Sequence, residues 1–314
     1  MRTGWSSVPA MPDLAQRGAW RVGARDAHGL GLLDAALEVE YAAGRYSGFG
    51  IDLPHATSTD PGELAKGHAY LRLVRAALDY LEGQVKTHSI DCDWSRDGKY
   101  QTTVTDDGKA QMLDPFVEML EMLGEPYEWV NGDDLVERVG FDHFKWSVYT
   151  PGCILMNPAA LVRGLVDSLP KNVFVHEETP VTEIEYRNGI TATTSGGSVR
   201  APKLILATNG FSEQFGFMKG KFLQFAAHAS LTRPLTEEER DVYPVKPWGI
   251  TPANAFAGIT QRYTNDHRLL IRQDIHINES QYCSPAMQAK KAVHHSKLFH
   301  ERFPMLPEVT IEDT

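Results

Sequence analysis

Residues 156–170, MNPAALVRGLVDSLP, form the clearest structural unit in the chain. Asn157 is typical of a helix N-cap, and Pro158 suits the first helical position because its missing N–H would find no partner there. An apolar stripe at helical spacing follows, made by Leu161, Val162, Leu165, Val166 and Leu169. Pro170 is expected to end this helix, which is amphipathic and therefore packs one face against a core.

Strand-like segments follow this helix along the chain. Residues 173–175, 181–186 and 190–194 are rich in β-branched residues, and Gly196-Gly197 predicts a hairpin turn. Leu204-Ile205-Leu206-Ala207 is a short apolar run between Pro202 and Gly210. Such a run predicts a buried strand of a parallel sheet.

The flanking regions continue the alternation of helices and strands. Helices are expected over 63–87, 112–123 and 285–302. Strands are expected over 99–105 and within 30–37, where the strand ends at Asp34. Long antiparallel strands are expected at 224–232, 253–263 and 269–272. This mixture of elements predicts an α/β fold (α+β mixed), in which two domains are interleaved along the chain.

Composition excludes several classes of protein. The net charge of −10 argues against broad nucleic-acid binding, which needs a basic surface. No apolar run approaches the ~18 residues of a membrane span, and the start of the chain has no apolar signal-peptide core. The three cysteines are widely spaced and fit neither a disulfide framework nor a zinc site, so a cytoplasmic location is expected.

Some residues suit a nucleotide cofactor. Asp34, at the end of its strand, can accept hydrogen bonds from a ribose, although a strand-end Asp at a turn is the alternative. The loop from Gly44 to Gly50 contains three glycines, which let backbone N–H groups approach a phosphate or flavin, while Arg45 and Ser47 add donors. Gly48 is one of these three glycines. The alternative interpretation is an ordinary surface turn, in which the same residues would also occur.

Small residues follow the apolar run at 204–207. Ala207, Thr208 and Gly210 would leave room for a dinucleotide at the carboxyl end of a parallel strand, or would simply form a tight turn. Val181 by itself indicates only a buried strand residue.

The order and spacing of these motifs resemble the D-amino-acid oxidase family of FAD-dependent oxidoreductases, particularly its glycine oxidase and γ-glutamylputrescine oxidase branches. The resemblance covers roughly residues 30–308 and is carried by four stretches: Leu32–Gly48, Met156–Val162, Thr179–Gly210 and Arg262–Leu270. The family usually has Asn where this chain has Tyr46.

The resemblance implies FAD as cofactor, with Val181 offering backbone groups to the adenine. It also implies oxidation of a C–N bond in a small-molecule amine or amino acid. The implied architecture is a partial FAD-binding Rossmann-like domain (1–60, 156–212 and the start of a return at 303–314), interleaved with a substrate domain (61–155, helical in part, and the antiparallel sheet 213–302). His228, Arg262 and Tyr263 are the polar candidates for substrate contact. Neither a catalytic residue nor an oligomeric state follows from the sequence.

Two features of the family pattern are missing. The phosphate loop G-x-G-x-x-G has no complete match, because Gly29–Asp34 fails at the third glycine and lies too close to the acid. The flavin-contacting segment expected after residue 307 is also lacking, so truncation at both ends is expected. A non-catalytic remnant with weak or no FAD binding is therefore the alternative, and an NAD(P)-binding reductase is a weaker one. The histidines His294, His295 and His300 lack partners for a tetrahedral metal site, and no metal is expected.

Overall fold

The computed structural model describes residues 30–33, 46–54, 60–254, 258–278 and 283–314. Its largest element is an eight-stranded sheet of order β15-β11-β14-β13-β12-β3-β5-β4. The strands are β3 (Lys99–Thr103), β4 (Glu128–Trp129), β5 (Trp146–Thr150), β11 (Phe225–Thr232), β12 (Trp248–Pro252), β13 (Thr260–Tyr263), β14 (Leu269–Ile277) and β15 (Ile311–Asp313). The predicted α/β class is confirmed, with an antiparallel block where the sequence placed it.

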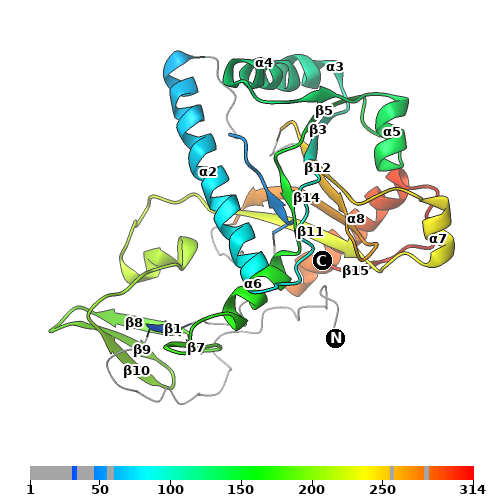
Figure 1. The fold of residues 1–314 in the computed structure, drawn as a ribbon. Helices are drawn as coiled ribbons and strands as arrows, with labels where there is room; N and C mark the ends of the chain where they lie inside the picture. The colour runs from blue at the N-terminus through cyan, green and yellow to red at the C-terminus, as the bar shows by residue number, and fades with distance from the viewer. Residues whose placement is uncertain (1–29, 34–45, 55–59, 255–257, 279–282) are drawn as a thin grey trace.

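The sheet joins two distant parts of the chain. All its neighbouring strands are antiparallel except β12 and β3, which pair in parallel through Ile250 with Tyr100 and Pro252 with Thr102. The segment between these two parts includes α6 (Pro158–Asp167) and a small three-stranded sheet, and this small sheet lies apart from the large sheet in Figure 1.

Helix α2 (Pro61–Thr87) confirms the predicted 63–87 helix. It begins where it does because Asp60 accepts hydrogen bonds from the N–H groups of Gly62 and Glu63. Its buried residues Leu71, Leu78 and Val85 recur every seven positions and so lie on one face. That face packs against α4 (Asp114–Leu123) at one end and α6 at the other.

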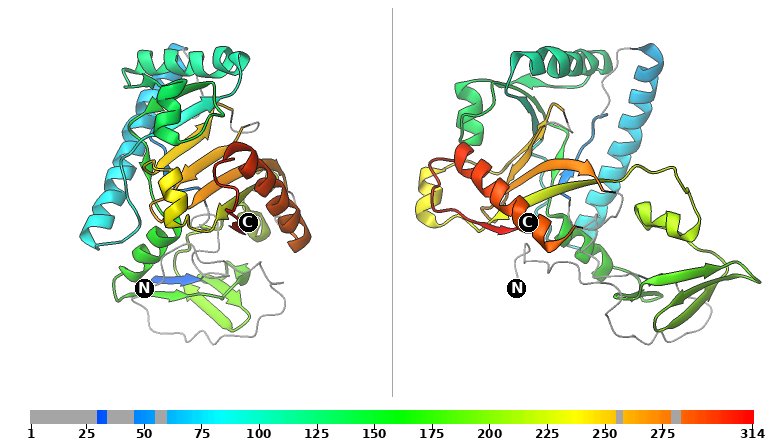
Figure 2. Two further views of the ribbon diagram at one scale, coloured as in Figure 1. Left: turned by 90° about the vertical axis from the view of Figure 1, so that its right-hand side faces the viewer. Right: turned by 180° about the vertical axis from the view of Figure 1, so that it is seen from behind.

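The main core lies on one face of the large sheet. Tyr100, Trp248, Ile250, Tyr263 and Ile271 point into it from four strands, and paired residues share a face because they lie directly opposite each other. Helix α8 (Pro285–Arg302), capped by Ser284, covers this face and adds Phe299 to the core (Figure 2). We call this the helix-side face of the sheet.

Three small sheets complete the described fold. β8 (Val181–Glu185), β9 (Ile190–Thr194) and β10 (Gly197–Ala201) form an antiparallel meander, which confirms the hairpin predicted at Gly196-Gly197. β1 (Leu30–Leu33) pairs in parallel with β7 (Val173–His176), and β2 (Phe49–Gly50) pairs antiparallel with β6 (Ile154–Leu155). We call the β2–β6 pair the ribbon.

Two strand predictions are wrong. Residues 204–207 form no strand, and Ile205 is 84% exposed. A buried parallel strand needs neighbours on its edges, and among the described residues none pairs with this run. The predicted strand at 253–263 is also wrong in its first part, because β12 ends at Pro252, β13 begins at Thr260, and the described residues 253, 254, 258 and 259 form no strand.

Other elements gave no clear signal in the sequence. They are the short helices α3 (Asp106–Gly108), α5 (Asp133–Val139) and α7 (Glu237–Val242), the π-helical turn η2 (Lys109–Leu113), the 3-10 helix η3 (Asn209–Phe215) and the strands β2, β4, β5, β6, β12 and β15. In the part of the chain that the structure describes, no helix combines the length and apolarity of a membrane span. The predicted domain boundaries stay predictions, and β15 in the 303–314 segment joins the large sheet through β11.

The contact between α8 and the sheet predicts a pH-dependent stability. His295 is fully buried, and its Nδ1 lies 2.7 Å from the Ser230 hydroxyl. Burial lowers the pKa of His295 from 6.5 to about 4, so the unfolded chain binds more protons between these values. The free energy of unfolding should therefore fall as the pH drops through this window, by at most about 1.4 kcal/mol per pH unit from this residue.

His295→Asn should flatten that pH dependence in urea unfolding, because asparagine does not titrate there. The exposed His68→Asn, on the solvent side of α2, is the matched control and should keep the wild-type slope. Equal slopes for wild type and His295→Asn would contradict the assignment.

Candidate functional site

The described part of the predicted cofactor loop leads into the ribbon. Ser47 and Gly48 precede β2, and the N–H of Met156, just after β6, donates to the Gly48 carbonyl at 2.9 Å. Gly48 has a φ of +80°, a left-handed conformation that glycine adopts without strain. A Cβ at this position would collide with Nη1 of Arg262 and the carbonyl oxygen of Met156. Only glycine therefore fits this turn without displacing its neighbours.

Arg262 fastens the loop to the large sheet. It extends from β13, and its Nη1 donates to the carbonyl oxygens of Gly48 at 3.3 Å, Ser47 at 3.4 Å and Met156. The side chain is buried, and no carboxylate forms an ion pair with it among the described residues. Burial lowers the pKa of Arg262 to about 10, which leaves the guanidinium charged at neutral pH. Its Nε–H is buried and has no hydrogen-bond partner in the described structure.

A second buried cation lies on the same face of the sheet. Lys99 begins β3, and its Nζ donates to Gln101 at 3.0 Å and to the hydroxyl of Thr251 at 3.2 Å. Burial lowers the pKa of Lys99 to about 8. Thr251 and Gly249 alternate with the core residues of β12, and Gly249 packs against Phe49 and Leu155 of the ribbon. We call this side, opposite the helix-side core, the ribbon-side face.

The three residues predicted to contact substrate do not come together. Arg262 lies on the ribbon-side face, but Tyr263, its neighbour in β13, points into the helix-side core, where its hydroxyl lies 3.0 Å from Nδ1 of His267. His228 lies two residues before Ser230 in β11 and therefore on the same face, toward α8. Its ring stacks on that of His276, with the ring centroids 5.2 Å apart. Of the three predicted residues, the ribbon-side face therefore holds one.

The predicted cofactor residues are only partly grouped. Ser47 and Gly48 belong to the loop under Arg262, whereas Val181 starts β8 of the separate meander. Ala207 and Thr208 are exposed, Thr208 bonding to Ser212 at 3.0 Å, while Gly210 is buried and leaves no space for a Cβ beside Gln224. Asp34, Gly44 and Arg45 lie outside the described residues. The cofactor assignments thus stay predictions.

Two residues of the ribbon-side face escaped the sequence analysis. Lys99 gave no signal, because a lysine at the start of a strand is ordinarily exposed. Gly249 did carry one, since a lone glycine within the apolar run Trp248-Gly249-Ile250 indicates a close approach of another segment. Here the approaching segment is the ribbon.

Comparisons with known proteins agree on one family. A family model described as FAD dependent oxidoreductase (DAO) matches residues 16–314. The fold is similar to glycine oxidase from Geobacillus kaustophilus (TM-score 0.65, 17% identity, covering 90% of this chain and 73% of that one). It is also similar to glycine oxidase from Bacillus cereus (TM-score 0.68, 15% identity, covering 91% of this chain and 74% of that one). A third similar structure is L-proline dehydrogenase from P. horikoshii (TM-score 0.64, 11% identity, covering 90% of this chain and 72% of that one). Among curated proteins no relative matches the chain.

The packing at Gly48 predicts a large difference between two glycine substitutions. Gly48→Ala should lower the free energy of unfolding by the left-handed penalty of about 1 kcal/mol plus roughly 1–3 kcal/mol for the collision with Arg262 and Met156. Gly124→Ala is the matched control, because Gly124 has a φ of +71° but no atom within 4 Å of an added Cβ. Gly124→Ala should lower the free energy of unfolding only by the left-handed penalty. Urea unfolding measures both, and similar losses would contradict the tight packing at Gly48.

Proposed function

Because the chain belongs to the family of FAD-dependent oxidoreductases, we propose that it oxidises the C–N bond of a small amine or amino acid to an imine. The observation that carries this proposal is the family match over residues 16–314. It is supported by structural relatives whose names place glycine and L-proline among their substrates. When bound, FAD accepts the hydride that leaves the carbon beside the nitrogen. The nitrogen loses a proton, the C=N bond forms, and water then hydrolyses the imine.

The ribbon-side face suits this cofactor. Arg262 keeps a buried Nε–H that lacks a partner in the described structure, and a donor of this kind is costly to leave unpaired. A carbonyl oxygen or a ring nitrogen of a flavin would satisfy it. The positive charges of Arg262 and Lys99, both deeply buried and without an ion-paired carboxylate in the described residues, also favour the electron-rich reduced form of such a ring. We therefore infer that these two residues tune the cofactor.

The roles of the remaining residues follow from their positions. Gly48 allows the loop to approach Arg262, and the loop's carbonyls hold the guanidinium in place. Among the predicted substrate residues we retain Arg262, since it alone lies on this face, where its charge also suits a substrate carboxylate. His228 and Tyr263 instead support the helix-side packing.

The first experiment tests cofactor and reaction together. The purified chain should bind FAD, with visible flavin absorption that survives gel filtration. Mixing it anaerobically with a panel of D- and L-amino acids and primary amines should bleach that absorption for at least one class, whatever the natural electron acceptor. A protein that takes up no added FAD would instead support the non-catalytic alternative, and FAD binding without bleaching by any C–N substrate would overturn the proposed reaction.

The second experiment tests Arg262. Arg262→Met should weaken FAD binding about ten-fold, because it removes a charge-assisted hydrogen bond worth roughly 1.5 kcal/mol or more. Arg262→Lys keeps the charge but not the planar fork, and should lie between Met and wild type. Near-ultraviolet circular dichroism of each variant shows whether the fold is retained. Unchanged FAD affinity in a folded Arg262→Met would leave Arg262 a purely structural role.

A further inference from the structure

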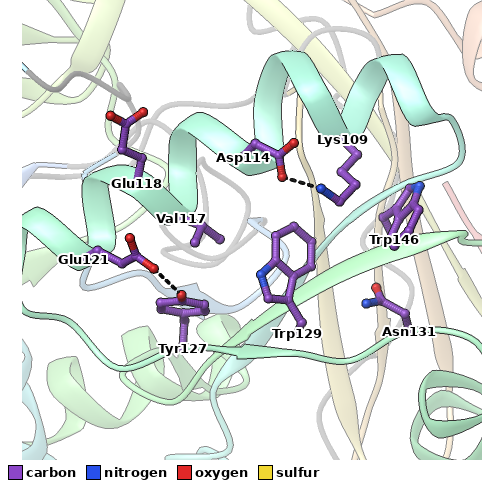
Figure 3. Close-up of a pocket in the computed structure, with 9 residues that line it drawn as sticks. All are labelled: Lys109, Asp114, Val117, Glu118, Glu121, Tyr127, Trp129, Asn131 and Trp146. Atoms are coloured by element: carbon purple, nitrogen blue, oxygen red, sulfur yellow. Dashed lines mark hydrogen bonds and ion pairs between the residues drawn. The ribbon is translucent and has the colours of Figure 1, made fainter.

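A hollow of about 440 Å³ opens at the far edge of the large sheet, between α4 and the strands β4 and β5 (Figure 3). It is lined by the aromatic residues Tyr127, Trp129 and Trp146, by the carboxylates of Asp114, Glu118 and Glu121, and by Lys109, Val117 and Asn131. β5 is three strands away from β13 in the sheet order, or roughly 14 Å at the usual strand spacing. The hollow therefore lies at the far edge of the sheet, away from Arg262 and the ribbon, although the pairing of Thr103 with Trp146 places it on the same side of the sheet as Lys99.

Its aromatic rings already hold a cation of the protein itself. Nζ of Lys109 lies 4.9 Å from the ring centroid of Trp129 and 5.3 Å from that of Trp146. These distances are within the range at which a cation is attracted to the face of an indole ring. Trp146 is fixed in this position, because its Nε1–H donates to Asp106 at 2.8 Å. The lining is thus built to stabilise positive charge.

The hollow also carries more negative than positive charge. Lys109 pairs with Asp114 at 2.5 Å, and Glu121 accepts a hydrogen bond of 2.6 Å from Tyr127, an interaction that raises the pKa of the tyrosine. Glu118, one turn of α4 after Asp114, has no hydrogen-bond or ion-pair partner in the described part of the structure. With three carboxylates and one lysine, the lining has two negative charges in excess.

A break in the helix creates this arrangement. Residues Lys109–Leu113 form a π-helical turn before α4, and the N–H of Asp114 bonds to the carbonyl of Lys109. Pro115 follows and has no N–H to continue regular helical bonding, which accounts for the wider turn. π-helical turns are uncommon and often occur at functional sites. In Figure 3 Trp129 stands between Lys109 on one side and the Tyr127–Glu121 pair on the other, and Glu118 lines the same hollow farther along α4.

We propose that this hollow binds a small organic ammonium ion, with its charge against Trp129 and opposite Glu118. The aromatic face and the carboxylate together recognise the charge, and the volume is sufficient for a small ligand. Lys109 limits the affinity, since it repels a second cation and occupies one side of the aromatic cage. The site goes beyond the proposed oxidation and does not depend on FAD.

The test uses choline and its uncharged analogue 3,3-dimethyl-1-butanol, at constant ionic strength. Binding is followed by the NMR shifts of the indole N–H groups of Trp129 and Trp146, assigned with Trp→Phe variants. Choline should shift both signals in a saturable way, and the neutral alcohol should not. Equal shifts with the two compounds, or none with choline, would overturn the proposal.

Variants identify the groups that recognise the charge. Glu118→Gln should weaken choline binding about five-fold, because an exposed charge pair contributes up to roughly 1 kcal/mol. Lys109→Met should strengthen it, since the competing cation is removed. Glu137→Gln, an exposed residue of α5 outside the hollow, is the matched control for net charge and should leave binding unchanged. If Glu118→Gln behaves like this control, Glu118 does not take part and the proposed site is wrong.

Discussion

The parallel pairing of β12 with β3 is the contact on which the large sheet depends. It joins residues 248–252 to residues 99–103, and the hydrogen bonds of this one pairing connect two antiparallel blocks that otherwise share no strand. Tyr100 and Ile250 lie opposite each other in it and point into the same core. Apolar burial and backbone pairing therefore reinforce each other where the two halves of the sheet meet. The helix α6 and the strands β6 to β10 are inserted between these halves without interrupting them.

The same pairing gives the sheet two chemically different faces. On the helix side, aromatic and aliphatic residues pack under α8. On the ribbon side, Lys99 and Arg262 are buried among hydroxyl, amide and carbonyl groups. Buried cations without a paired carboxylate are costly. The cost is reduced for Arg262 by backbone carbonyls of the Gly48 loop and Met156, and for Lys99 by the side-chain oxygens of Gln101 and Thr251. The loop and the Arg262 charge therefore position each other. This arrangement is what makes the face suitable for an electron-rich ring.

At the far edge of the sheet a positive charge is stabilised in a different way. Lys109 is stabilised there by indole faces and by Asp114, close to solvent, and its charge can be replaced by that of another cation. Both regions thus stabilise positive charge. Arg262 and Lys99 are held by backbone carbonyls and side-chain oxygens, and Lys109 in the hollow by aromatic rings and a carboxylate. The first arrangement suits a firmly held cofactor, and the second suits a ligand that exchanges.

The sequence by itself determined the regular elements whose signals are local. The Asn157-Pro158 start of α6, the seven-residue spacing of Leu71, Leu78 and Val85, and the Gly-Gly hairpin all depend on near neighbours, as does the motif order that indicated the family. Tertiary structure decided the rest. Whether 204–207 formed a buried strand depended on the presence of neighbouring strands. The environments of Arg262 and Tyr263 depended on what packs against each face of the sheet, the Gly48 loop on one and the core under α8 on the other. The burial of Lys99 and the grouping of Trp129, Trp146 and Glu118 depend on side chains that are distant in the chain, and no local pattern reports such contacts.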